Sequence, residues 1–453
     1  MTEQQVRWTA EQVLALAPDD ASRKAGGKLG GAGPWSQTGG SASGAVWGWC
    51  KGSGSKPYRT VVDLTGPAYT CSCPSRKFPC KHALGLLLLW AAEGLGEPAE
   101  APDWAAEWLA KRAEKAAARS APAAPADAEA ARRRAERRAG RIGAGVTELE
   151  RRLADLLRAG LAGQEQAGYG VWEETAARMV DAQAPGLAAR VRELGTIPSS
   201  GAGWPGRMLE ECALLHLLDR AWLGAAGLPE PLAATVRTRV GLPAAAEGAA
   251  AVRDRWLVLA QYDSVSADGR LTTRRIWLQG LEGDRKALVM DYGPPGRPPQ
   301  LALPVGLVLE AEARFRPGSA GLRADLGDRF AAPAPHSRPP AGMSAGAALE
   351  EYGTALREDP WLDSWPVVLG PVVPIPGELG WQLADADGKD ALPVRTGGGR
   401  AGAGLWQLAA LSGGGPVTVF GECGHRGFVP LTAWQTETQA DTDMGTGEPV
   451  SLS

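Results

Sequence analysis

The spacing of apolar positions changes several times along the chain, and each change predicts a different kind of element. Near the start, Thr9-Ala-Glu-Gln12 has the pattern of a capping box and predicts a short helix. Residues 26–44 are rich in glycine and serine and predict a flexible loop. Alternating apolar residues predict strands at 46–49 and 58–64, and the apolar run 83–92 predicts a buried helix.

Beyond this first region, designated 1–95, the pattern divides the chain into four further parts. Residues 96–145 are rich in Ala, Arg and Glu with few large apolar side chains, and predict a basic linker. Apolar residues recur at helical spacing over 146–250, short strands separated by turn residues are expected over 251–335, and 346–453 mixes both patterns. We therefore expect an α+β, multidomain protein with an N-terminal ββα module, a helical middle and a β-rich C-terminal part.

Composition narrows the possible classes of protein. The chain has 453 residues, of which 44% are hydrophobic, so it can bury several cores and is not a disordered protein. Its formal net charge of −3 gives no global attraction to nucleic acid, so any charge argument must be local. The longest apolar stretch has about ten residues, roughly half of a membrane span, and the N-terminus lacks the pattern of a signal peptide. We expect a cytoplasmic protein without membrane contact.

Cysteine and histidine are concentrated in one short segment. Of six Cys and four His in the chain, three Cys and one His fall between Cys71 and His82, in the pattern Cys71-x-Cys73…Cys80-x-His82. Alternate residues of an extended segment point to the same side, so Cys71 and Cys73 can both face one ion. Cys80 and His82 supply the second pair where the next helix begins. Structural zinc takes four N or S ligands in a tetrahedron. The spacing predicts one structural Zn²⁺ per chain, held by Cys71, Cys73, Cys80 and His82.

Two other interpretations of these residues stay open. They could be buried thiols with a core histidine, or the cysteines could serve redox chemistry, although redox pairs are more often spaced Cys-x-x-Cys. The cysteines outside the cluster, Cys50, Cys212 and Cys423, show no disulfide framework, which agrees with a reducing compartment.

The string Cys71-Ser-Cys-Pro-Ser-Arg-Lys-Phe-Pro-Cys-Lys-His-Ala-Leu84, after a β-hairpin and before an apolar helix, resembles the SWIM-type zinc finger of bacterial, especially actinobacterial, proteins. The resemblance covers residues 45–93. It implies a zinc-binding module that contacts DNA or proteins. It also implies a context beside MoxR-type AAA ATPases, and so a possible ATPase partner.

The predicted module carries a local excess of positive charge. Between Lys51 and His82 there are six basic residues and one acid, Asp63, with aromatic residues interleaved. Such a surface is typical of macromolecular interaction and is compatible with nucleic acid. The candidate contact residues for a partner or a nucleic acid are Lys51, Lys56, Arg59, Arg76, Lys77, Phe78 and Lys81.

The sequence indicates zinc-ion binding in an interaction module, most simply a protein–protein adaptor, with DNA or RNA binding as the alternative. We expect no enzyme activity, and an enzyme with an unrecognised site in residues 146–453 is the second alternative.

Three weaker signals are interpreted structurally. Ser344, in Gly342-x-Ser-x-Gly346, is expected to cap a helix because a proline-rich segment precedes it in place of a strand. Cys212 and His216 are spaced i, i+4 on a helix and are expected on a core face, because leucines surround them. Cys423 and His425 lack a second Cys pair nearby in sequence.

Overall fold

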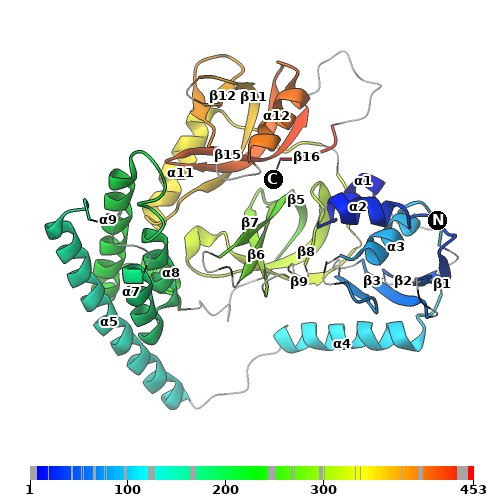
Figure 1. The fold of residues 1–453 in the computed structure, drawn as a ribbon, viewed down its shortest axis with the longest axis horizontal. Coiled ribbons are helices and arrows are strands. Elements are labelled where there is room, and N and C mark those ends of the chain that lie inside the picture. Colours follow the sequence, from blue (N-terminus) through cyan, green and yellow to red (C-terminus); the bar gives the residue numbers. More distant parts are fainter. Residues whose placement is uncertain are drawn as a thin grey trace.

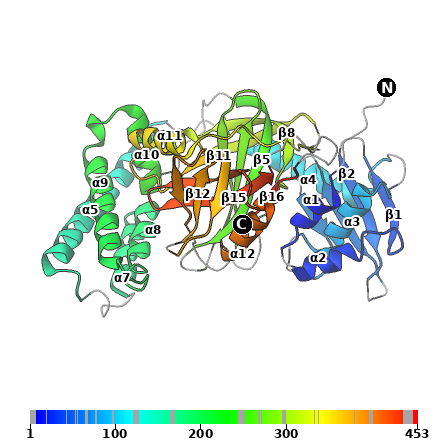
Figure 2. The same ribbon diagram turned by 90° about the horizontal axis from the view of Figure 1, so that it is seen from above.

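The computed structural model describes residues 8–452 apart from a set of short gaps: 19, 42–43, 53, 55, 65–67, 76, 78, 96–98, 121–127, 164–169, 243–250, 267–268, 270, 295–298, 300, 332, 337, 379, 396–400 and 436–446. Helices and antiparallel sheets alternate along the chain, which confirms the α+β class. An N-terminal α/β module lies at one end, a helical bundle at the other, and two β-rich domains between them (Figure 1). The view from above shows the same order (Figure 2).

The N-terminal module is a four-stranded antiparallel sheet with helices on both faces. Its strands follow one another in space in the order of the sequence: β1 (Trp35–Gly40), β2 (Ala45–Cys50), β3 (Tyr58–Asp63) and β4 (Ala68–Cys71). One face carries α3 (Lys81–Ala91), which is covered in turn by α1 (Ala10–Ala15) and α2 (Asp20–Gly27). Because α3 is sandwiched in this way, its apolar run is buried almost throughout. Gly85 permits the close packing, since a Cβ there would lie 2.5 Å from Leu29 Cβ.

The expectation of a loop over residues 26–44 is wrong for part of that segment. β1 lies within it and pairs with β2, with Trp35 opposite Cys50. Backbone pairing needs no apolar side chain, and the indole of Trp35 supplies the anchor, donating to Leu29 O at 2.7 Å. Gly39 leaves room for the ring of Trp47, because a Cβ at position 39 would lie 2.8 Å from that ring. The capping box at Thr9 and Gln12 is present as expected.

The segment expected as a linker, 96–145, contributes two helices. α4 (Asp103–Ser120) packs on the second face of the N-terminal sheet, where Ala105 joins Trp47 and Val61 in a buried cluster. Asp63 and Arg112 form an ion pair of 2.8 Å across the same contact. This docking uses Trp104, Trp108 and Leu109, which precede the Ala- and Arg-rich stretch. Residues 128–145 of the segment form the first half of α5 (Ala128–Ala159).

The helical bundle contains α5 (Ala128–Ala159), α7 (Gly170–Asp181), α8 (Pro185–Leu194), α9 (Trp204–Leu223) and α10 (Glu230–Val240). Its core begins at Ile142, so the first half of α5 extends beyond the bundle and exposes its arginines (Figure 1). Among the helices that the structure describes, none combines the length and apolar character needed to cross a bilayer.

The first β-rich domain curls into a small barrel. It contains β5 (Ala251–Val265), β6 (Thr272–Gly280), β7 (Lys286–Gly293), β8 (Leu307–Phe315), β9 (Ala324–Arg329) and β10 (Ala334–Pro335). β5 pairs with β6 and β8, β6 with β7, and β8 with β9. The Leu288 N–H then donates to Leu322 O at 2.7 Å, which brings β7 beside the segment leading into β9. The barrel interior is continuous with the core of the N-terminal module.

The C-terminal domain adds a second six-stranded sheet and two helices. Its elements are α11 (Ala345–Glu358), β11 (Trp365–Ile375), β12 (Gln382–Asp385), β13 (Ala391–Pro393), α12 (Ala401–Ser412), β14 (Val417–Gly424), β15 (Gly427–Gln435) and β16 (Val450–Ser451). Phe420 and Trp434 pack against Trp277 of the barrel. The indole N–H of Trp277 donates to Glu422 Oε1 at 2.9 Å. One face of β5 and β6 is therefore covered by this domain.

Candidate metal centre

The four predicted ligands meet at the junction between β4 and α3. Cys71 ends β4, Cys73 follows it, Cys80 is the N-cap residue of α3 and His82 lies in the first turn of that helix. Their ligand atoms all lie within 4.8 Å of one another. Cys80 and His82 are buried, whereas Cys71 and Cys73 are half-buried. A partial positive charge at the helix N-terminus favours thiolates at this place.

The distances between the ligand atoms fit a tetrahedrally coordinated ion. His82 Nδ1 lies 3.6 Å from Cys71 Sγ and 4.0 Å from Cys80 Sγ. A tetrahedron built with zinc–sulfur bonds of about 2.3 Å and zinc–nitrogen bonds of about 2.0 Å has sulfur–nitrogen edges of about 3.5 Å. Three thiols and one imidazole are the donor set of structural zinc. The cluster thus supports zinc binding and assigns Nδ1 as the imidazole ligand.

Neighbouring side chains hold the ligands in place. The Thr60 hydroxyl donates to Cys71 Sγ at 3.3 Å. The ring of Tyr58 packs on the His82 imidazole, with centroids 4.8 Å apart. Ser72, between the first two ligands, is tied to β3 by two hydrogen bonds: its N–H donates to Arg59 O, and its Oγ accepts from Arg59 N–H, both at 3.0 Å. Contacts of this kind orient ligands and tune their affinity for the metal.

The side chains of the cluster differ in how strongly they hold their protons. Hydrogen bonds from Cys71 and then Cys80 lower the pKa of Cys73, whereas the pKa of Cys80 is raised by its hydrogen bonds to Cys71 and Cys73. Burial works to lower the pKa of His82, but hydrogen bonds with Cys71 and Cys73 outweigh it and raise the pKa to about 9. A metal ion must displace these protons in order to bind.

Cys50 lies beside the cluster but is not part of it. Its side chain is fully buried, and burial, followed by the charge on Cys71, raises its pKa to about 11. Such a thiol stays protonated at neutral pH and packs as a small apolar group. It therefore offers a matched comparison for the ligand cysteines.

The basic residues predicted to contact a partner lie on the surface of the module. Lys51, Lys56, Arg59, Lys77 and Lys81 are all exposed. The Arg59 guanidinium lies 6.0 Å from the centroid of the Trp49 ring. Arg76 and Phe78, also predicted as contacts, lie outside the described residues.

The weaker sequence signals have structural roles. Ser344 caps α11, its side chain accepting from Ala347 N–H at 3.2 Å. Cys212 is buried in the bundle core as expected, but the expectation of a core face is wrong for His216, which is exposed and pairs with Glu150 at 2.8 Å. Cys423 is buried.

His425 projects from the same C-terminal domain and contacts α9. Its Nε2 pairs with Glu210 at 2.7 Å. Within the described residues, the only Cys and His side chains gathered with metal-ligand geometry are those at 71–82.

Sequence reasoning missed one feature of the module, a groove beside the metal centre that is lined partly by α4. Trp104 and Trp108 form one wall of it. These two residues are spaced i, i+4, the helical repeat that places side chains on one face, and this spacing was the available signal.

Comparison with known families agrees with this geometry. A model of the SWIM zinc finger matches residues 58–91, and a model of the SWIM-associated four-helix bundle domain matches residues 137–240. Searches of curated proteins and of solved structures gave no match. The second match starts close to Ile142, where α5 enters the bundle core, and ends with α10. The chain therefore contains a SWIM zinc finger, which is followed by the helical bundle domain associated with it.

Proposed function

We propose that this protein is a non-enzymatic adaptor that binds a protein partner through its zinc module, with one structural Zn²⁺ per chain. The observation that carries the proposal is the closed ligand set of Cys71, Cys73, Cys80 and His82. Four protein ligands complete a tetrahedral zinc shell and leave no position for a substrate. The ion then serves to organise the surface around it.

The way in which the domains are joined supports this role. The zinc module shares a core with the barrel, and the barrel packs on the sheet of the C-terminal domain. A buried ion pair connects the C-terminal domain to the bundle. The zinc module is therefore presented at one end of a continuous body, as an adaptor requires, with the bundle available at the other end.

Nucleic-acid binding is the second candidate because the module exposes several cations. The first half of α5 adds the exposed arginines Arg132, Arg133, Arg134 and Arg137. Two of these are paired with acids on the same helix, Arg132 with Glu136 and Arg133 with Glu129. A gel shift that weakens steeply with salt, and is lost when Lys77 and Lys81 are replaced by Glu, would favour this candidate.

The expected cytoplasmic location and the MoxR-type ATPase partner remain part of the proposal. Six cysteines that form no disulfide fit a reducing compartment. The ATPase comes only from the resemblance of the finger to its bacterial counterparts.

Affinity purification of the full chain followed by mass spectrometry tests the proposal. Four samples are compared: wild type and Cys80→Ser, each with and without nuclease. We expect a protein partner that survives nuclease and is lost with Cys80→Ser. If recovery depends on nucleic acid, the second candidate is favoured; if it is indifferent to Cys80→Ser, the zinc module is not the binding site.

A further inference from the structure

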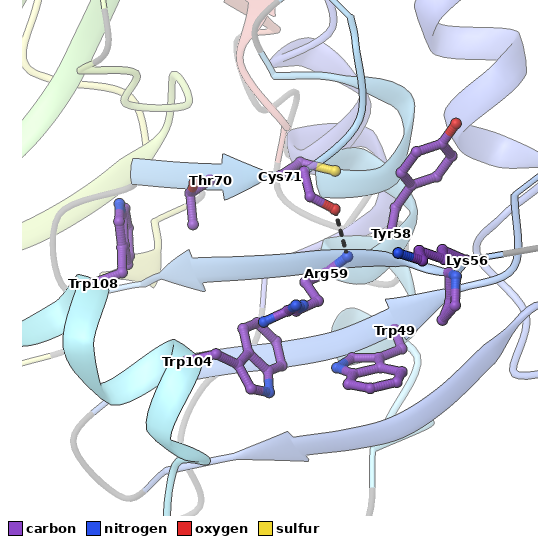
Figure 3. Close-up of a pocket in the computed structure, with 10 residues that line it drawn as sticks. Trp49, Lys56, Tyr58, Arg59, Thr70, Cys71, Trp104 and Trp108 are labelled. Atoms are coloured by element: carbon purple, nitrogen blue, oxygen red, sulfur yellow. Dashed lines mark hydrogen bonds between the residues drawn. The ribbon is translucent and has the colours of Figure 1, made fainter.

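A groove with a volume of about 590 Å³ opens on the outer face of the N-terminal sheet, beside α4 (Figure 3). It is distinct from the metal shell, although Cys71 borders both. The lining residues come from β2, β3, β4, α4, the loop before β3 and the residue after β4: Trp49, Lys56, Pro57, Tyr58, Arg59, Thr70, Cys71, Ser72, Trp104 and Trp108.

The groove exists because α4 covers only part of the sheet. Ala105 closes over Trp47 and Val61, which form a buried cluster with it. Trp49 lies two residues beyond Trp47 and so projects from the same face, opposite Arg59 in the register of β2 and β3. Beyond the end of this contact the face is open, and Trp49 and Arg59 form its floor (Figure 3).

Aromatic side chains dominate the lining. Trp49 lies on the sheet, Trp104 of α4 lies beside it, and Trp108, one helical turn further on, lies near Thr70 (Figure 3). The indole N–H of Trp49 is buried and has no hydrogen-bond partner among the described residues. Indole rings offer broad apolar faces together with N–H donors, a combination that suits proline-containing extended peptides, whose carbonyl groups project outward.

The charge of the lining is positive. Lys56 and Arg59 are exposed, and none of the ten lining residues is acidic. A cationic ligand is therefore disfavoured, whereas a carboxylate can pair with Arg59 or Lys56 while its neighbours pack on the rings.

We propose that this groove binds an extended, acidic segment of a partner protein, with proline or aromatic side chains between the indoles and carboxylates against Lys56 and Arg59. The proposal rests on the adaptor function and names the chemistry of the partner. A polynucleotide suits the groove less well, because its phosphates require a continuous basic track. On α4 the exposed residues beside the tryptophans include Asp103 and Glu107, and Glu107 already pairs with Lys111 at 2.6 Å.

A display library of random twelve-residue peptides, selected on the zinc-loaded full chain, tests this inference. We expect the enriched peptides to be acidic and to contain proline or aromatic residues. Synthetic versions should bind at least about tenfold more weakly to Trp49→Ala and to Arg59→Glu. Trp406→Ala, which removes a tryptophan that is 69% exposed in the C-terminal domain, should bind them as wild type does. Zinc content, measured for each variant, shows that the module remains folded.

Three results would overturn the inference: enrichment of neutral or basic peptides, affinity that Arg59→Glu leaves unchanged, or no enrichment at all. Binding of a twelve-nucleotide oligothymidylate that both groove variants abolish would assign the groove to nucleic acid. Partner capture from cells separates this inference from the adaptor function. If a partner is lost with Cys80→Ser but retained by Arg59→Glu, the adaptor function stands and the groove is not its site.

Discussion

The guanidinium of Arg239, at the end of α10, forms an ion pair with the carboxylate of Asp359, which follows α11. Nη2 lies 2.6 Å from Oδ2, and Nε lies 3.2 Å from Oδ1. Asp359 is fully buried, so this ion pair sits inside the contact between the bundle and the C-terminal domain. Two residues further on, Trp361 inserts into the bundle core and donates its indole N–H to Leu214 O at 2.9 Å. The two domains therefore share one interior.

Replacing Arg239 with Ala leaves the buried carboxylate of Asp359 without its counter-charge. We expect the free energy of unfolding to fall by about 3–5 kcal/mol, because an uncompensated buried charge is costly. Urea unfolding followed by far-UV circular dichroism measures this change. Arg237→Ala is the control: Arg237 pairs with Glu230 on the exposed side of α10, and its loss should cost at most about 1 kcal/mol. Equal effects of the two changes would contradict the interpretation.

Cys80→Ser removes one thiolate from the metal shell. We expect the purified protein to lose its zinc and the N-terminal module to unfold, because a structural zinc site supplies on the order of 10 kcal/mol or more to a small module. Elemental analysis gives the ratio of zinc to protein, and limited proteolysis reports the unfolding. Cys50→Ala, which removes an equally buried thiol outside the ligand set, should retain the ion. Loss of zinc from both variants would show that Cys50 takes part.

Thr60→Val replaces the hydroxyl that donates to Cys71 Sγ with a methyl group of similar size. Hydrogen bonds to ligand atoms typically change metal affinity by about 10- to 100-fold, so we expect zinc binding to weaken within this range. Competition with a chromophoric chelator measures the affinity. Thr70→Val, on the opposite face of the sheet, is the matched control. An unchanged affinity for Thr60→Val would mean that the hydroxyl does not act on the metal.

The metal centre could be predicted because its information is local. Cys71 to His82 span twelve residues, and the chemistry of three thiols and an imidazole is independent of the rest of the fold. The buried helix α3, which follows the cluster, could be predicted equally well, because it is apolar on nearly every side.

The groove and the contacts between domains could not be predicted in the same way. Trp49 and Trp104 are 55 residues apart in sequence, and only the docking of α4 brings them together. Arg239 and Asp359 are separated by 120 residues, and neither has a local pattern that distinguishes it from a surface charge. β1 was missed because its glycine and serine residues give no strand pattern, whereas its pairing with β2 is made by the backbone.

Asp219, on α9, gives the bundle a dependence on pH. Its carboxyl group is fully buried. Burial, and then the negative charge of Glu150, raise its pKa to about 9. In the unfolded chain the pKa of an aspartate is about 3.9. The folded state therefore holds a proton that the unfolded state releases, so the contribution of Asp219 to stability is greatest below about pH 4 and declines as pH rises toward 9.

We expect Asp219→Asn, which cannot ionise, to remove this decline, so that its stabilising effect is larger by about 4–5 kcal/mol at pH 8 than at pH 4.5. Urea unfolding of wild type and variant at pH 4.5, 6 and 8 measures the difference between them, so that other titrating groups cancel. Asp181→Asn, an exposed position on α7, should leave the difference near zero throughout. A gain that is the same at all three pH values would show that Asp219→Asn acts through packing, since only the loss of an ionising group makes the gain grow with pH.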